Sequence, residues 1–190
     1  MLTDTPATTL RSLKTFLPQL AVDLSTTDRT LRRALADGLI RGERPSPRTV
    51  DLPLAERVYL TAAWPLLAEL RAGLRTEPSL RLAVLFGSQA RGDAGPTSDV
   101  DLLVRTKEGV RLREVLSRLE AKLGRSLHAV TVTEAARSPL LLAEALRDGR
   151  VLVDRDGDWP ELRRSRSRVE RDARLQRKSI DEAFAAAFEP

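Results

Sequence analysis

The chain has 190 residues, of which 42% are hydrophobic and 31% are charged, which is enough for one medium-sized domain or two small ones. It contains no cysteine, which excludes disulfide scaffolds, thiolate zinc sites and cysteine nucleophiles. Its apolar stretches fall far short of the ~20 residues of a membrane span, and its N-terminus has no apolar core, so we expect a cytoplasmic protein that binds no membrane.

The formal net charge of +5 is distributed unevenly along the chain. Residues 29–48 carry a balance of +4, residues 163–178 carry +6, and the remainder carries −5. A net charge alone does not establish binding to nucleic acid. The positive charge is thus concentrated in two basic segments, whereas the rest of the chain is acidic.

The first part of the chain, residues 1–54, is predicted to be a winged helix-turn-helix domain. Its third helix has apolar residues at i, i+3 and i+4 spacing and ends at Gly38, a residue that commonly follows a helix. The order of helices followed by a hairpin is typical of this domain. The expected elements are helices over 8–16, 18–24 and 28–37 and two short strands within 39–54.

The arginines of this segment are candidates for DNA contact. Three of them share one face of the predicted recognition helix, and the others lie on the predicted wing. A duplex would accept the helix in its major groove and the wing along its backbone. The alternative is that they only solvate a small domain packed on the rest of the chain. The predicted DNA-binding residues are Arg29, Arg32, Arg33, Arg41 and Arg44.

The remainder of the chain is predicted to contain three further parts. Residues 55–78 form a linker helix that is interrupted or kinked at Pro65, residues 79–157 form an α/β domain, and residues 158–190 form a basic helix. Alternation of strands and helices indicates a mixed or parallel sheet. The expected elements of the middle part are strands over 82–86, 100–104, 127–132 and 151–153 and helices over 109–123 and 134–147.

The segment from Leu85 to Val104 carries the candidate chemistry. A buried strand ends at Gly87-Ser88, and the next strand begins at Asp99-Val100-Asp101. Residues i and i+2 of a strand point to the same face, so both carboxylates are expected to face Gly87-Ser88. Such a pair favours Mg²⁺ (or Mn²⁺), a hard cation that binds carboxylates together with phosphate oxygens. The pattern predicts metal-assisted nucleotidyl transfer, whereas the alternative is a hairpin with two solvated aspartates.

This segment resembles the minimal nucleotidyltransferases of the polymerase β-type superfamily, many of which are antitoxins paired with HEPN-type toxins. Their signature is Gly-Ser, ten residues, then Asp-x-Asp, and the resemblance covers about residues 80–154. It implies an α/β (α+β) nucleotidyltransferase domain with a mixed sheet, here between the winged-helix domain and a helical tail. It further implies ATP or another NTP as substrate. The implied roles are nucleotide binding for Gly87, Ser88 and Arg91 and metal ligation and catalysis for Asp99 and Asp101.

The family's third carboxylate is missing from its usual place. Active members carry it at the start of the next central strand, where this sequence has His128, its only histidine. Imidazole is a poor ligand for Mg²⁺ but could serve as a catalytic general base. His128 could equally be an ordinary strand residue, and Glu134 could be a substitute acid or the cap of the next helix.

Two functions follow from these observations. The first is a Mg-dependent antitoxin enzyme that transfers NMP, in particular AMP from ATP, to a hydroxyl of a protein or RNA. A small-molecule acceptor also stays open. The alternative is a DNA-binding antitoxin or transcriptional regulator whose transferase fold is catalytically degenerate. Expected partners are a HEPN-type toxin, DNA through the N-terminal domain, and a second copy of the chain.

Overall fold

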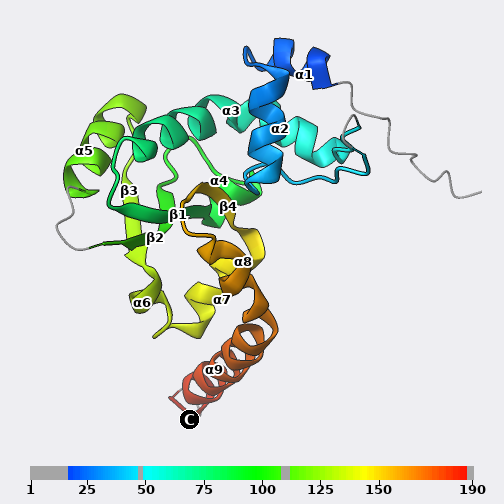
Figure 1. Cartoon of the computed structure of the whole chain (residues 1–190). Helices are drawn as coiled ribbons and strands as arrows, with labels where there is room; N and C mark the ends of the chain where they lie inside the picture. The colour runs from blue at the N-terminus through cyan, green and yellow to red at the C-terminus, as the bar shows by residue number, and fades with distance from the viewer. Residues whose placement is uncertain (1–16, 47–48, 108–111, 188–190) are drawn as a thin grey trace, which may run out of the picture.

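A four-stranded mixed sheet lies at the centre of the computed structural model, which describes residues 17–46, 49–107 and 112–187 (Figure 1). The strand order is β3-β2-β1-β4. β1 pairs antiparallel with β2 and with β4, and β2 pairs parallel with β3. The strands are β1 (Leu80–Phe86), β2 (Val100–Thr106), β3 (Leu127–Thr131) and β4 (Arg150–Asp154). All four predicted strands are therefore present.

Helices cover both faces of this sheet (Figure 1). The helices α1 (Leu17–Asp23), α2 (Asp28–Ala36) and α3 (Leu54–Arg75) precede the sheet in the sequence. The short helix α4 (Gly87–Arg91) follows β1. The later helices are α5 (Leu112–Leu123), α6 (Val132–Ala135), α7 (Pro139–Asp148), α8 (Asp158–Arg164) and α9 (Arg166–Ala187).

The alternation of side chains along β1 produces two hydrophobic cores. Leu82, Val84 and Phe86 pack with buried residues of α7 and with Trp159. Leu85 faces the other way, into a cluster with α3, α5 and the N-terminal helices. Because successive strand residues point to opposite faces, an uninterrupted apolar strand is what a sheet covered on both sides requires.

The predicted linker helix is a long, continuous element of the second core. Leu60, Leu67 and Leu74 of α3 are fully buried at seven-residue spacing, and the helix runs through Pro65 without ending. A proline inside a helix removes one backbone hydrogen bond. The buried face on the sheet offsets that loss, so the expected interruption at Pro65 does not occur.

The N-terminal segment matches its prediction in part. α1 and α2 lie where helices were expected, whereas the predicted helix over 8–16 lies outside the described residues. In the expected wing, the described residues contain one antiparallel bridge, in which Glu43 and Asp51 exchange two hydrogen bonds of 2.9 Å. The winged helix-turn-helix is not confirmed and stays a prediction, as do the domain boundaries.

Two local predictions are wrong. The helix expected over 134–147 is divided into α6 and α7, because Pro139 starts a new helix. Thr131 and Glu134 form a reciprocal capping box at the start of α6, in which the two hydrogen bonds from Thr131 lower the pKa of the Glu134 carboxyl. The segment after β1, expected to be a loop, begins with α4.

Candidate active site

Gly87 and Asp101 lie against each other at the junction of β1 and α4. Phe86 pairs with Asp101 across the two strands, and Gly87 follows with a positive φ of 71° that turns the chain directly into α4. A Cβ added at Gly87 would lie 2.6 Å from Oδ2 of Asp101, closer than real Cβ contacts allow. Glycine is needed here for both its backbone conformation and the space it leaves to the carboxylate.

Asp101 is a half-buried carboxylate in an acidic environment. Burial raises its pKa above the ordinary value, the charges of Glu144 and Asp99 raise it further, and His128 and Arg91 oppose this rise. Asp99 is more exposed and lies just before β2. Asp101 therefore lies against Gly87 as predicted, and Asp99 is near enough for its charge to act on Asp101.

His128 lies beside both acids. It is the register partner of Asp101 in the parallel pairing of β2 and β3, and its Nδ1 is 3.8 Å from Oδ2 of Asp99. Its side chain is 65% exposed, so it is not a satisfied core histidine. An exposed imidazole next to two carboxylates is placed to take up a proton from a substrate that binds there.

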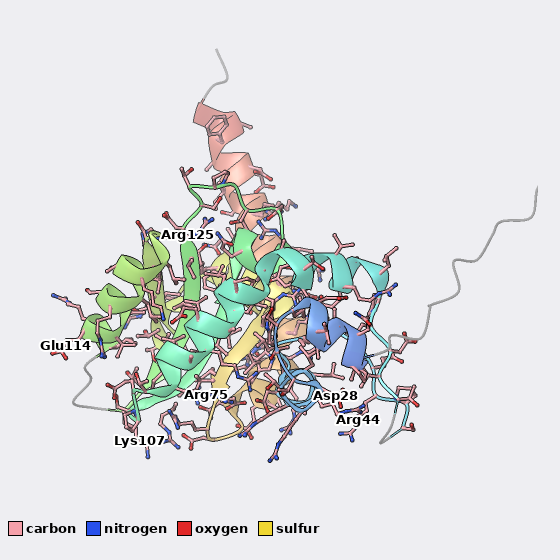
Figure 2. The ribbon with its side chains drawn as sticks, turned by 90° about the horizontal axis from the view of Figure 1, so that it is seen from above. Asp28, Arg44, Arg75, Lys107, Glu114 and Arg125 are labelled. Carbon is pink, nitrogen blue, oxygen red and sulfur yellow. The ribbon has the colours of Figure 1, made fainter. Side chains whose placement is uncertain are left out.

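The loop that connects α4 to Asp99 is fixed by side chains from three parts of the chain. The Gln89 side-chain amide donates to the Ser98 carbonyl at 3.2 Å. Arg125, labelled in Figure 2, donates to the carbonyls of Ser98 and Gly95 at 3.1 and 3.3 Å. The Gly95 N–H donates to the Ser98 hydroxyl at 2.8 Å. These bonds set the position at which the chain enters β2, and hence the position of both aspartates.

A buried polar cluster holds the opposite side of α4. The guanidinium of Arg150, a residue only 1% exposed, donates to the Ala90 carbonyl at 2.7 Å and forms a bidentate pair with Glu56 at 2.6 and 2.9 Å. It also lies 3.7 Å from the centroid of the Tyr59 ring. The Tyr59 hydroxyl donates to the Gln89 carbonyl, and burial raises the pKa of Tyr59 to about 12. Sequence patterns gave no sign of this cluster.

Arg91, predicted to bind nucleotide, is the centre of an acidic group. It pairs with Asp93 at 3.1 Å, with Glu144 at 2.7 Å and with Asp148 at 3.2 Å. Its hydrogen bonds to these carboxylates raise its pKa. The sequence analysis did not single out Glu144, although its position four residues before Asp148 on α7 places both acids on one helical face.

The residues at this site fit a divalent cation that arrives with its substrate. Among the residues that the structure describes, no group of three or more His, Cys, Asp or Glu side chains is arranged to hold a metal. Asp99 and Asp101 offer oxygens, the donors that Mg²⁺ prefers, and Mg²⁺ commonly completes its shell with substrate phosphates and water. Asp99 and Asp101 would be the ligands, and the charge of Asp99 contributes to the raised pKa of Asp101.

The predicted DNA-binding arginines differ in their surroundings. Arg29 and Arg33 are exposed on α2, and Arg32 pairs with Asp28 at 2.8 Å. Arg41 instead donates to the Asp148 carbonyl, next to the group around Arg91. Arg44 projects from the loop after α2, at the end of the molecule opposite α5 (Figure 2). DNA contact by these residues stays a prediction.

Residues 69–158, just under half of the chain, match the model of the family described as "Polymerase beta, Nucleotidyltransferase". The matched segment contains the sheet, α4, both aspartates and His128. The predicted fold class is thereby confirmed: this part of the chain has a nucleotidyltransferase fold with a mixed sheet, followed by a helical tail.

Several solved structures are similar to the chain over this region. A toxin–antitoxin with AMP-PNP is 21% identical, with a TM-score of 0.47, and the match covers 65% of this chain and 98% of that one. A tri-AMPylated Shewanella oneidensis HEPN toxin in complex with MNT antitoxin is 19% identical, covering 67% and 98%, with a TM-score of 0.43. The toxin–antitoxin MntA-HepT is 20% identical, covering 65% and 96%, with a TM-score of 0.42.

Two further comparisons gave no positive finding. No protein with a curated function matches the sequence significantly. Within 17–46, 49–107 and 112–187, none of the helices combines the length and the hydropathy needed to span a membrane.

Proposed function

We propose that the chain is a nucleotidyltransferase that moves a nucleoside monophosphate, in particular AMP from ATP, to an acceptor hydroxyl in the presence of Mg²⁺ or Mn²⁺. The observation that supports this most strongly is the contact between Gly87 and the carboxylate of Asp101. A hairpin with solvated aspartates would need neither a glycine at this position nor a half-buried acid.

In the proposed reaction the acceptor oxygen forms a bond to the α-phosphorus, and the bond from that phosphorus to the bridging oxygen breaks. Pyrophosphate leaves, and the hydroxyl proton passes to His128. Asp99 and Asp101 hold the divalent cation, which when bound would neutralise charge that develops on the transferred phosphate. Gly87 and Ser88 would contact the remaining phosphates through their backbone, and Arg91 would contact a phosphate only by releasing one of its three carboxylate partners.

We also propose that the chain acts as an antitoxin. The support is the resemblance of Gly87-Ser88, ten residues and Asp99-x-Asp101 to the minimal nucleotidyltransferases, many of which pair with HEPN-type toxins. The acceptor would then be a hydroxyl of the toxin or of an RNA. Repression of its own operon through α2 is compatible with this role, since DNA contact and transfer use different residues.

The test is transfer of label from α-³²P-labelled ATP, GTP, CTP and UTP to total RNA and to total cellular protein, with Mg²⁺ or Mn²⁺. We expect Asp101→Asn to lower the rate by about 10²–10³, because a metal contact is worth several kcal/mol in the transition state. Asp172→Asn, a matched change on the exposed part of α9, should leave the rate unchanged. Equal labelling by wild type and Asp101→Asn would refute the assignment.

A further inference from the structure

A large arginine-lined groove runs along β4, the edge strand of the sheet, and its lining also includes Arg81 of β1. One wall is α2 with the turn after it, and the other wall is α8 (Figure 1). The end of α3 and the end of α7 also contribute to its lining. Its volume is about 1600 Å³. This exceeds the ~300–1,000 Å³ of typical small-molecule pockets, so the groove fits a segment of a polymer better than a single small ligand.

The charge of this groove is strongly positive. Its lining contains eight arginines but only two carboxylates, Asp37 and Asp154. Asp154 is already used, since it accepts the backbone N–H groups of Asp158 and Trp159 at the start of α8. The arginines come from separate elements. The periodicity of a single helix therefore does not explain why they line the same groove.

The carboxylates near the groove neutralise only some of these arginines: Arg81 pairs with Asp156, Arg147 with Asp148 at 2.8 Å, and Arg164 with Glu161 at 3.9 Å. Asp37 is shared by Arg71, by Arg75 at 3.4 Å and by Arg33 at 4.0 Å. Arg155 donates only to carbonyl oxygens, at the ends of α3 and β1. The side chain of Arg163 makes no hydrogen bond or ion pair with the residues that the structure describes. A surplus of positive charge is therefore left for a ligand.

Arg41 gives independent support for this surplus. Partial burial of its guanidinium end and the charge of Arg150 both lower its pKa, and the nearby Glu56 and Asp148 do not restore it. A cation in this condition gains when an anion binds beside it.

The lining also indicates which polyanion would fit. The large apolar residues Ile40, Leu152 and Trp159 of its lining are buried, whereas the exposed apolar residues Ala36 and Pro160 are small, so the accessible surface is more polar than apolar. A protein partner would need exposed apolar or aromatic anchors, which dominate protein–protein binding. Interfaces with nucleic acid are more polar and much more positive. With Trp159 buried, the groove has no platform on which bases could stack, so contact would be with the backbone and independent of base sequence.

We propose that this groove binds the phosphodiester backbone of a nucleic acid. The groove shares Arg33 and Arg41 with the residues predicted to contact DNA, but its other arginines lie outside the N-terminal segment, on α3, β1, α7, the turn after β4 and α8. The proposal does not depend on nucleotidyl transfer. Arginine suits the role because its planar fork donates two parallel hydrogen bonds to a phosphate.

The test is fluorescence anisotropy of labelled 20-mers of single-stranded RNA, single-stranded DNA and duplex DNA, with polyglutamate as a competing polyanion. The variant is Arg163→Gln/Arg164→Gln, which removes two exposed arginines from the α8 wall, neither of them predicted to contact DNA. Its matched control is Arg168→Gln/Arg171→Gln, which removes the same charge from an exposed part of α9 outside the groove.

We expect the groove variant to bind about tenfold more weakly than the control. The slope of log affinity against log salt should fall by about 1.4 for a single strand, since each lost phosphate contact removes about 0.7. The preferred 20-mer identifies the kind of nucleic acid. Equal losses in variant and control, an unchanged salt slope, or tighter binding of polyglutamate would each overturn the proposal.

Two controls keep this result separate from the proposed function. Unfolding temperatures of both double variants should match that of wild type, because all four side chains are exposed. Asp99→Asn/Asp101→Asn should bind the 20-mers as wild type does, even though it cannot transfer label. Loss of nucleic-acid binding in this acid-pair variant would contradict a separate groove.

Discussion

The buried pair of Arg150 and Glu56 allows a sharp prediction about stability. Glu56→Gln keeps the shape of the side chain but removes its charge, so the guanidinium of Arg150 stays buried without a counter-ion. Glu56 is 5% exposed, and its Oε1 also accepts the Arg41 N–H at 2.9 Å. We expect a loss of about 3–5 kcal/mol in the free energy of unfolding, the cost of removing one partner of a buried ion pair.

That loss is a large part of the ~5–15 kcal/mol by which a typical domain is stable. For a chain of this length it corresponds to a fall of roughly 6–20 °C in unfolding temperature. The measurement is urea unfolding followed by circular dichroism, with thermal unfolding as a second readout. If Glu56→Gln costs less than about 1 kcal/mol, the pair is not the buried, desolvated contact described above.

A double-variant cycle tests the reasoning further. Arg150→Met alone should also destabilise, because it leaves the Glu56 carboxylate buried without its partner and the Ala90 carbonyl without its donor. Combining it with Glu56→Leu should recover part of the loss, since two apolar side chains need no counter-charge. Strict additivity of the two single changes would refute a direct interaction between them.

Three further outcomes are expected from the site residues. Gly87→Ala should cost at least about 1–2 kcal/mol of stability, because alanine at φ +71° is strained. It should also abolish transfer, because the added Cβ displaces Asp101. Stability and labelling equal to those of wild type would refute this. Asp101→Asn, besides slowing transfer, should raise the unfolding temperature at pH 7, and a lower temperature would contradict the sign of its pKa shift. The sign follows because the folded chain holds the Asp101 proton more tightly than the unfolded chain, so its contribution to stability falls as pH rises above the ordinary aspartate pKa. His128→Gln should lower kcat by about 10²–10⁴ with unchanged nucleotide binding, as for loss of a general base, whereas unchanged kcat would identify an ordinary strand histidine.

The parts of the site that follow from local periodicity could be predicted from the sequence. Asp99 and Asp101 share a face because strand side chains alternate, and Gly87 faces them because a strand ends there. His128 was expected beside the acids as a residue of the next central strand, and its pairing with Asp101 confirms that position.

The parts that depend on tertiary contact could not be predicted. Arginine is rarely buried, so Arg150 reads as a surface residue until Glu56, 94 positions earlier, is placed beside it. α4 is too short for a helical period to be visible, and it exists because Gly87 turns the chain and Tyr59 and Arg150 bind its carbonyls. The arginine groove is assembled from segments that are distant in the sequence. Counting charge along the chain showed two basic segments, but it could not show that their arginines line one groove.

The position of Arg150 has a consequence for the order in which the site can form during synthesis. A growing chain that has emerged only as far as β3 contains Gly87, both aspartates and His128. It still lacks the side chain that binds the Ala90 carbonyl and neutralises Glu56. Until β4 has been synthesised, Glu56 at the start of α3 therefore lacks the Arg150 side chain that pairs with it. The proposed transfer activity is therefore expected to arise only once β4 has joined the sheet.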